Sequence, residues 1–246
     1  MKSVRMAARQ ERRFSRLFVS PPARVVRAVV HGTPIFLTVV NPKDEIQRHH
    51  ISGQFYEPEE LAIIARHFPL GGAFLDIGAN VGNHSVYVAK FLHAARIVVF
   101  EPNPEAIAIL DSNIFLNGID GVCDRQFLGI GLSDRAAAAA SLRTPRRNLG
   151  GTRVVDGAGE IRLEAGDTLL EGQIFDLIKI DVEGMELAVL AGLAGLIAAT
   201  RPKLFVEVDV RNQPKFAEWL TASGYGVLEQ FQRYAQNVNF LVGPTS

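Results

Sequence analysis

The sequence predicts an α/β fold in which a seven-stranded, mostly parallel sheet carries helices on both faces and ends in an antiparallel strand. Two observations support this. Between residues 73 and 222, short apolar runs of strand length alternate with segments of helical periodicity, and two β-rich runs at 225–231 and 237–242 close the chain as a hairpin. Within 73–104, an apolar run, a glycine loop, a helix and a second apolar run follow one another, which indicates a βαβ unit.

Composition is that of a globular protein with an unusual N-terminus. The chain has 246 residues, of which 48% are hydrophobic and 21% charged, and no apolar run reaches the ~20 residues that span a bilayer. Residues 1–27 hold eight basic residues and one acidic residue, so this arm carries +7 and the rest of the chain −7. An anionic membrane, a nucleic acid or an acidic partner would attract such an arm, and a solvated terminus or a transit peptide has the same composition.

We therefore divide the chain into a basic arm (1–27), a hairpin and helix that pack on the main domain (28–72) and the main domain itself (73–246). The hairpin, 24–30 and 35–40, would cover an edge or the mouth of the sheet, and a helix begins at Pro58. The single cysteine, Cys123, excludes an internal disulfide and fits a reducing cytosol. We expect a cytoplasmic protein without a secretory signal, in which the arm could contact the membrane surface.

The glycine loop indicates the ligand. Asp76 ends the first strand, two residues before Gly78, and Gly82 follows in the pattern D-x-G-x-x-x-G. A carboxylate at this position repels a pyrophosphate but suits the ammonium and sulfonium of S-adenosylmethionine, and Glu101, at the end of the next strand, can accept hydrogen bonds from ribose hydroxyls. The alternative is that Asp76 only caps the helix and Glu101 is a solvated strand end.

Five segments, DIGANVG, FEPNP, LDSNIFLNG, GLSD and IKIDVEGMELAVLAG, resemble, in this order, the FkbM-type family of S-adenosylmethionine-dependent methyltransferases. The resemblance covers 55–242 and implies a class I methyltransferase (Rossmann-like) fold, usually with O-methylation. The cofactor-binding residues assigned on these motifs are Asp76, Gly78, Asn80, Gly82, Glu101, Asn103 and Gly131. Gly131 lies where we expect the adenine ring. The alternative is a glycine-rich turn that binds no ligand, which would have the same sequence pattern.

The acceptor side is assigned partly by the same resemblance, which implies that Asn148 and Gly150 cap the acceptor pocket. The nearby Arg143, Arg146 and Arg147 could hold a phosphate or carboxylate of the substrate, or form a solvated loop. Tyr56 or Glu57 could reach the methionine end of the cofactor, unless the segment 55–56 only packs the following helix onto the sheet.

Catalysis is assigned to carboxylates at the rim of the sheet. Asp181 follows a buried strand and would accept the proton of the acceptor hydroxyl, while Glu183 and Glu207 would orient hydroxyl groups. Two alternatives remain: the three carboxylates could hold Mg²⁺, which we do not favour, or Glu183 could cap the next helix. His84, after the glycine loop, is a second candidate base, and Lys179 is expected to pair with a carboxylate.

The predicted function is O-methylation of a hydroxyl on a sugar, glycolipid or secondary metabolite, with a small-molecule, glycan or lipid acceptor. A nucleic-acid methyltransferase that uses the basic arm is a rival, but D-V-E-G stands where amino-methylating enzymes have N/D-P-P-Y/F. A cofactor-binding protein without catalysis is the other rival. The sequence does not predict the oligomeric state.

Overall fold

A computed structural model describes residues 23–143, 148–156, 159 and 161–245. Most of the predicted basic arm, as well as Arg146 and Arg147, therefore lies outside the described residues. Among the helices of the described part, none has both the length and the apolar character needed to cross a bilayer.

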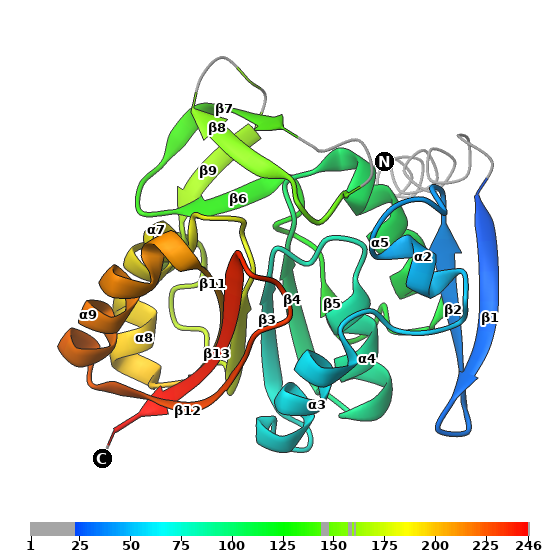
Figure 1. Cartoon of the computed structure of the whole chain (residues 1–246), viewed down its shortest axis with the longest axis horizontal. Coiled ribbons are helices and arrows are strands. Elements are labelled where there is room, and N and C mark those ends of the chain that lie inside the picture. The colour runs from blue at the N-terminus through cyan, green and yellow to red at the C-terminus, as the bar shows by residue number, and fades with distance from the viewer. Residues whose placement is uncertain (1–22, 144–147, 157–158, 160, 246) are drawn as a thin grey trace, which may run out of the picture.

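The main sheet has seven strands in the order β12-β13-β11-β10-β3-β4-β5 (Figure 1). Its central strands β11, β10, β3, β4 and β5 are parallel, and β13 runs antiparallel to both β11 and β12, as predicted. The bounds are β3 Ala73–Ile77, β4 Arg96–Phe100, β5 Cys123–Asp124, β10 Leu177–Ile180, β11 Lys203–Asp209, β12 Tyr225–Phe231 and β13 Asn237–Pro244. The carboxyl ends of β3, β10 and β11 therefore meet at one edge of the sheet.

Helices cover both faces of this sheet, because successive side chains of each buried strand point to opposite sides. Phe74 of β3 packs in one cluster with α3 (Pro58–His67), α4 (Asn83–Phe91) and α5 (Pro104–Leu116). The next residue, Leu75, packs in the other cluster with α7 (Glu186–Gly192), α8 (Ala194–Thr200) and α9 (Gln213–Ser223). The sequence pattern predicts one helix over 185–198, whereas the structure has two helices, which meet at Leu193.

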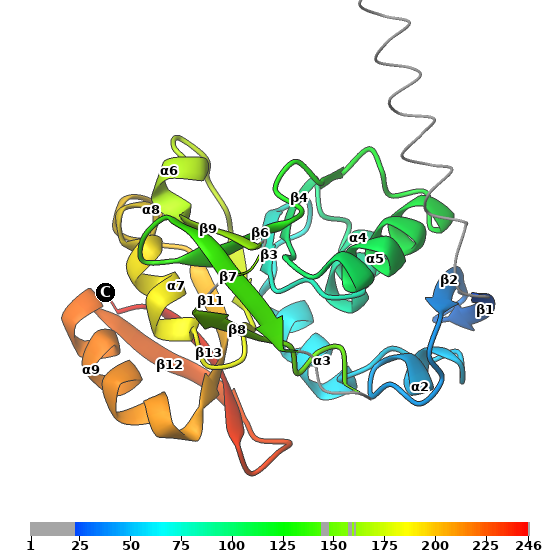
Figure 2. The ribbon, with the colours of Figure 1, turned by 90° about the horizontal axis from the view of Figure 1, so that it is seen from above.

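A second sheet was not predicted. Four strands, β6 Ile130–Ser133, β7 Ala137–Arg143, β8 Arg153–Asp156 and β9 Ile161–Ala165, pair in the order β6-β9-β7-β8. Figures 1 and 2 show this small sheet lying across one end of the main sheet. β7 could not be predicted because its alanine run lacks the polar and apolar alternation of a half-buried strand.

The N-terminal hairpin, β1 (Arg24–Val30) and β2 (Thr33–Val39), forms where it was predicted but packs against α5 rather than on an edge or the mouth of the sheet. Asn113 and Asn117 of α5 explain this position. The Asn113 Oδ1 accepts from the backbone N–H of Thr38 at 2.7 Å, and Asn117 Oδ1 accepts from that of Phe36 at 3.0 Å. These side chains accept hydrogen bonds from backbone N–H groups of β2 that a further strand would otherwise bind. Two short helices, α2 (Gln47–His50) and α6 (Gly166–Leu169), and a 3₁₀ turn at Val210–Asn212 complete the described elements.

Candidate active site

Two adjoining cavities lie at the carboxyl ends of the parallel strands. The larger has a volume of about 720 Å³ and the smaller about 60 Å³. Five residues line both cavities, namely Gly78, Asn80, Gly150, Asp181 and Glu183. The cavities are therefore two parts of one crevice, at the position where open parallel sheets bind ligands.

The glycine loop brings the end of β3 against the end of β10. Gly78 has a φ of 76°, and a Cβ added there would lie 1.9 Å from the carbonyl oxygen of Asp181, so no other residue fits. Gly82, with a φ of 83°, begins α4. Asn80 also lies in the left-handed region, at a φ of 49°, and its Oδ1 is buried without a hydrogen-bond partner among the described residues. An unpartnered acceptor in a strained loop is typical of a binding site.

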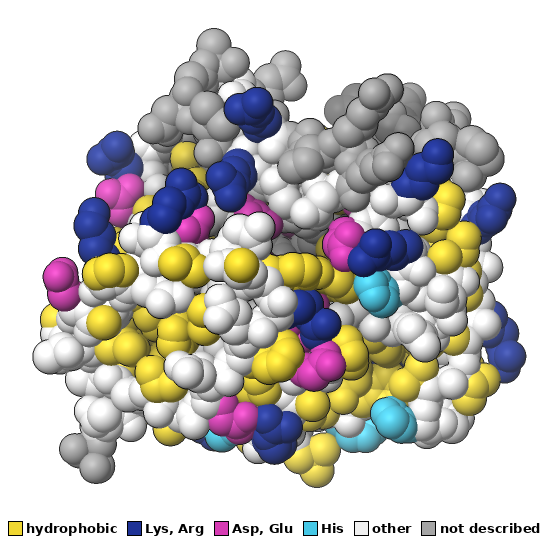
Figure 3. All heavy atoms as spheres, in the orientation of Figure 1, with side chains coloured by type: hydrophobic (Ala, Val, Ile, Leu, Met, Phe, Trp, Pro, Cys, Tyr) yellow, Lys and Arg dark blue, Asp and Glu magenta, His cyan; other side chains and the backbone are white. Residues whose placement is uncertain are grey.

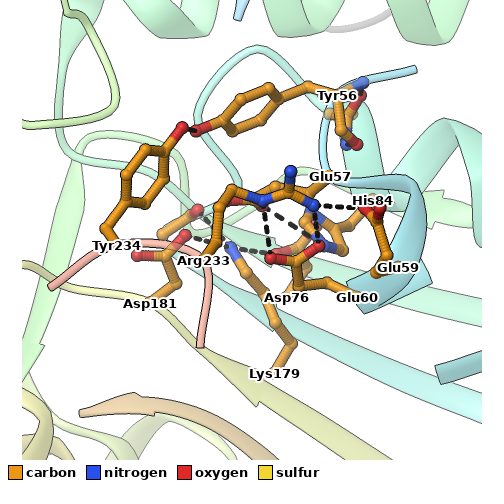
Figure 4. A network of polar contacts seen from close by, with 12 residues as sticks. Tyr56, Glu57, Glu59, Glu60, Asp76, His84, Lys179, Asp181, Arg233 and Tyr234 are labelled. Carbon is orange, nitrogen blue, oxygen red and sulfur yellow. Dashed lines mark hydrogen bonds and ion pairs between the residues drawn. The ribbon is translucent and has the colours of Figure 1, made fainter. Parts of the chain in front are cut away.

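Asp76 lies beneath this loop instead of in the crevice. It is fully buried, accepts a hydrogen bond from Ser85 Oγ at 2.6 Å and lines neither cavity. Lys179 Nζ lies 3.3 Å from Asp76 Oδ1 and 3.3 Å from Asp181 Oδ2, and it donates to the carbonyl oxygen of Gly78 at 2.7 Å (Figure 4). The pairing of Lys179 with carboxylates is as predicted. Asp76 thus supports the loop through Lys179, and direct contact with a cofactor cation remains a prediction.

The electrostatics of Lys179 follow from this arrangement. Burial by itself lowers the pKa of Lys179, but Asp181, Asp76 and Glu57 outweigh it, so the pKa is raised and the ammonium stays charged. A charged lysine at this point holds the ends of β3 and β10 together.

Glu101 lies at the end of β4 and lines the smaller cavity together with Gly131 of β6. Its two carboxylate oxygens accept hydrogen bonds from the backbone N–H groups of Asn80 and Asn103, each at 2.8 Å. Burial raises the pKa of Glu101 to about 7, and these two hydrogen bonds offset part of that rise. Asn103 itself caps α5 by accepting from the N–H of Glu105. The carboxylate is thus fixed in orientation at the cavity wall.

An acidic floor lines the larger cavity; we use this name for Glu57, Asp181, Glu183 and Glu207. The three carboxylates predicted to converge do so, and Glu57 joins them. Burial, followed by the charge of Asp181, raises the pKa of Glu57 to about 8, that of Glu183 to about 7 and that of Glu207 to about 10. Among the described residues, no group of three or more His, Cys, Asp or Glu side chains is arranged to hold a metal ion.

His84 is buried at the wall of the larger cavity. Its Nε2 has no hydrogen-bond partner among the described residues and lies 3.9 Å from Glu57 Oε2. Burial, together with the positive charge of Lys179, lowers the pKa of His84 to about 3. The imidazole is therefore neutral, and its Nε2 is enclosed beside the carboxylate of Glu57.

Residues 52–60 form one wall of the site, and Asn83 fixes them there. Its Oδ1 accepts from the N–H of Tyr56 at 2.9 Å and lies 3.1 Å from His50 Nε2, while its Nδ2 donates to the carbonyl oxygen of Tyr56 at 2.9 Å. The polar stretch around His50 predicts a surface residue, and this prediction is wrong, since His50 is fully buried. Sequence reasoning missed Asn83, whose only signal was its place directly after Gly82.

The same wall is tied to the turn between β12 and β13 (Figure 4). Tyr56 and Tyr234 meet at their hydroxyl groups, 3.0 Å apart, and Arg233 binds Glu59 and the buried Glu60. Phe55 packs in the core, whereas Tyr56 and Glu57 line the larger cavity. The packing role predicted for this segment is therefore confirmed for Phe55, and contact of Tyr56 or Glu57 with the cofactor remains a prediction.

The acceptor-side candidates also reach the crevice. Asn148 and Gly150 line the larger cavity, together with Arg143. Their loop is fixed by the N–H of Gly151, which donates to Asn148 Oδ1 at 2.9 Å, and by that of Leu149, which donates to Asp44 Oδ2 at 2.7 Å.

The sheet order, the antiparallel strand β13 and a ligand crevice at the carboxyl ends of the strands define a class I, Rossmann-like methyltransferase fold. The chain belongs to the FkbM methyltransferase family, because the model described as "Methyltransferase FkbM domain" matches residues 76–233.

Curated relatives and solved structures agree with this assignment. The chain is 29% identical to the hexuronic acid methyltransferase AglP of Haloferax volcanii over 57% of each chain, and 27% identical to the methyltransferase sdnD of Sordaria araneosa over 51% of this chain and 61% of the relative. It thus spans about three fifths of the length of the curated relatives it matches.

Two solved structures share the fold. One is the methyltransferase FkbM of Methylobacillus flagellatus, with a TM-score of 0.51 and 16% identity over 70% of this chain and 44% of that one. The other is the tRNA m1G37 methyltransferase of M. jannaschii, with a TM-score of 0.52 and 13% identity over 93% of this chain and 59% of that one.

Proposed function

We propose that this protein is an S-adenosylmethionine-dependent O-methyltransferase that acts on a hydroxyl of a sugar or of a sugar-like small molecule. One observation carries the proposal: a small cavity with a fixed carboxylate, Glu101, opens into a larger cavity with an acidic floor, at the carboxyl ends of β3, β4 and β10. The carboxylate of the first suits the ribose hydroxyls of a nucleoside, and the second suits a cationic group beside a hydroxylated acceptor.

The residues present fit the cofactor. Glu101 offers two carboxylate oxygens to vicinal ribose hydroxyls, and Gly131 lies on the wall of the same cavity. The unpartnered Asn80 Oδ1 and the acidic floor would hold the ammonium of the methionine part. When bound, S-adenosylmethionine supplies a methyl group that its sulfonium makes electrophilic.

The chain's own residues position the acceptor and remove its proton. Asp181 is the proposed hydrogen-bond acceptor or base for the reacting hydroxyl, with Glu183 and Glu207 as orienting groups. Two neighbours can carry a proton at neutral pH, because burial raises the pKa of Glu183 to about 7 and that of Glu207 to about 10, so they can donate hydrogen bonds to substrate oxygens. His84, held neutral, is the alternative base.

The acceptor class draws support from one relative, since the protein of Haloferax volcanii is named for a hexuronic acid, which is a hydroxylated sugar. The tRNA methyltransferase structure is 13% identical in sequence, so its similarity supports the fold alone. We therefore favour a sugar, glycolipid or secondary metabolite over a nucleic acid.

Titration calorimetry with S-adenosylmethionine tests the cofactor site. Glu101→Gln should weaken binding by roughly a hundredfold, because hydrogen bonds to a charged group contribute about 1.5 to 3 kcal/mol each. Glu218→Gln, an exposed change on α9, is the matched control and should bind as the wild type does. Equal affinities of the two variants would contradict the assignment.

Mass spectrometry tests the reaction. Hydroxylated sugars, glycolipids and metabolites incubated with protein and cofactor should gain the mass of one methylene group, and Asp181→Asn should abolish the gain while cofactor binding persists. Cofactor binding without any methylated product would instead favour a binding protein.

A further inference from the structure

Two arginines face each other across the strands that overhang the larger cavity. Arg143 of β7 and Arg153 of β8 are direct partners in the antiparallel register, so both side chains leave the same face of the small sheet. Both line the larger cavity, and neither lines the smaller one. Figure 3 shows Lys and Arg side chains gathered over this small sheet.

The positive charge of this pair is only partly neutralised by the described residues. Arg143 has no carboxylate within ion-pair distance in the part of the chain that the structure describes. Arg153 Nε lies 3.9 Å from Glu183 Oε2, which is beyond hydrogen-bond distance. Like charges directly opposite each other on a sheet destabilise it, and an anion between them would relieve that repulsion.

The two other described arginines of this region differ from the pair. Arg135 and Arg162 lie outside both cavities, and each has a nearby carboxylate, with Arg135 at 3.8 Å from Asp134 and Arg162 at 2.6 Å from Glu164. Of these four arginines, Arg143 and Arg153 line the larger cavity, and Arg143 has no carboxylate within ion-pair distance among the described residues.

We propose that Arg143 and Arg153 bind a carboxylate or phosphate group of the methyl acceptor, so that the substrate is an anionic hydroxyl compound such as a uronic acid or a sugar phosphate. Planar guanidinium groups bind both anions through paired hydrogen bonds. The inference rests on the proposed function, because it assigns the larger cavity to the acceptor. The carboxylate of the cofactor is the other anion that could reach this pair, and the experiment separates the two.

The test uses the full chain saturated with S-adenosylhomocysteine, to which D-glucuronate, D-glucose 6-phosphate and D-glucose are added in ligand-observed NMR titrations. We expect the wild type to bind at least one of the two anions at least about tenfold more tightly than glucose. Arg143→Gln and Arg153→Gln should each weaken anion binding about tenfold, whereas Arg135→Gln and Arg162→Gln should not. Binding of glucuronate but not of glucose 6-phosphate would identify a carboxylate as the bound group. Binding of glucose 6-phosphate but not of glucuronate would identify a phosphate.

The affinity for S-adenosylhomocysteine is measured first for every variant. If Arg143→Gln or Arg153→Gln lowers it as much as anion binding, the arginines hold the cofactor carboxylate and the inference is overturned. Anions that bind no better than glucose overturn it as well. A wild type that binds neither S-adenosylhomocysteine nor S-adenosylmethionine would instead refute the proposed function, which separates the two failures.

Discussion

Replacing Lys179 with methionine should destabilise the fold far more than an ordinary surface change. The Lys179 side chain is 3% exposed, and its ammonium lies 3.3 Å from the carboxylate of Asp76, which is fully buried. Without Lys179, Ser85 Oγ is the one remaining donor to that carboxylate among the described residues. Breaking a buried pair by removing one partner costs about 3 to 5 kcal/mol, which is a large part of the ~5 to 15 kcal/mol that stabilises a typical domain.

The free energy of unfolding is measured in urea, with the single tryptophan, Trp219, as the probe. Asp76→Asn combined with Lys179→Met is the informative companion, because it removes the orphaned charge and should recover at least about 1 kcal/mol relative to Lys179→Met alone. A single variant within about 1 kcal/mol of the wild type would show that the pair does not hold the strand ends together.

Three further predictions concern the same site. Gly78→Ala should lower the free energy of unfolding in urea by at least about 2 kcal/mol more than Gly71→Ala. Both glycines have positive φ, but of the two only Gly78 has backbone atoms where a Cβ would lie, so equal costs would contradict the close approach of Gly78 to Asp181. Burial raises the pKa of Glu57 from 4.5 to about 8, so its contribution to stability is fully present below about pH 4.5 and is lost as the pH rises through 8. Glu57→Gln should therefore flatten the decline of the melting temperature with pH, and an unchanged slope would refute this prediction. His84, whose pKa burial lowers to about 3, should show no titration of its ring protons by NMR between pH 5 and 8, and a titration in that range would contradict its burial as a neutral imidazole.

The predicted parts of the fold are those that local sequence encodes. The βαβ unit could be recognised because Gly78 and Gly82 occupy positions that need positive φ, and because buried parallel strands are continuous apolar runs. The meeting of Asp181 with Glu207 followed from topology alone, since residues that follow parallel strands share one edge of the sheet.

The parts that were missed depend on contacts distant in sequence. Asn113 is read in isolation as an ordinary mid-helix asparagine, and its role becomes visible only once β2 lies beside α5. His50 is buried because its neighbour across the site is Asn83, which no spacing rule connects to it. Glu57 reaches the acidic floor through a left-handed backbone conformation with a φ of 58°, and sequence patterns do not predict this conformation for a glutamate.

The acidic floor links the fold to its proposed chemistry. Lys179 is committed to Asp76 and Asp181, so Glu57 and Glu207 lie within the same cavity without a cation in contact, among the described residues. Burial therefore raises the pKa of both carboxyl groups, to about 8 and about 10, and they hold protons at neutral pH. A cationic ligand in this cavity would favour their ionised forms and so release those protons. The same carboxyl groups that destabilise the empty site at high pH would thus favour a ligand with an ammonium or sulfonium over a neutral or anionic one. Arg143 and Arg153, which line the same cavity, would instead favour an anionic acceptor.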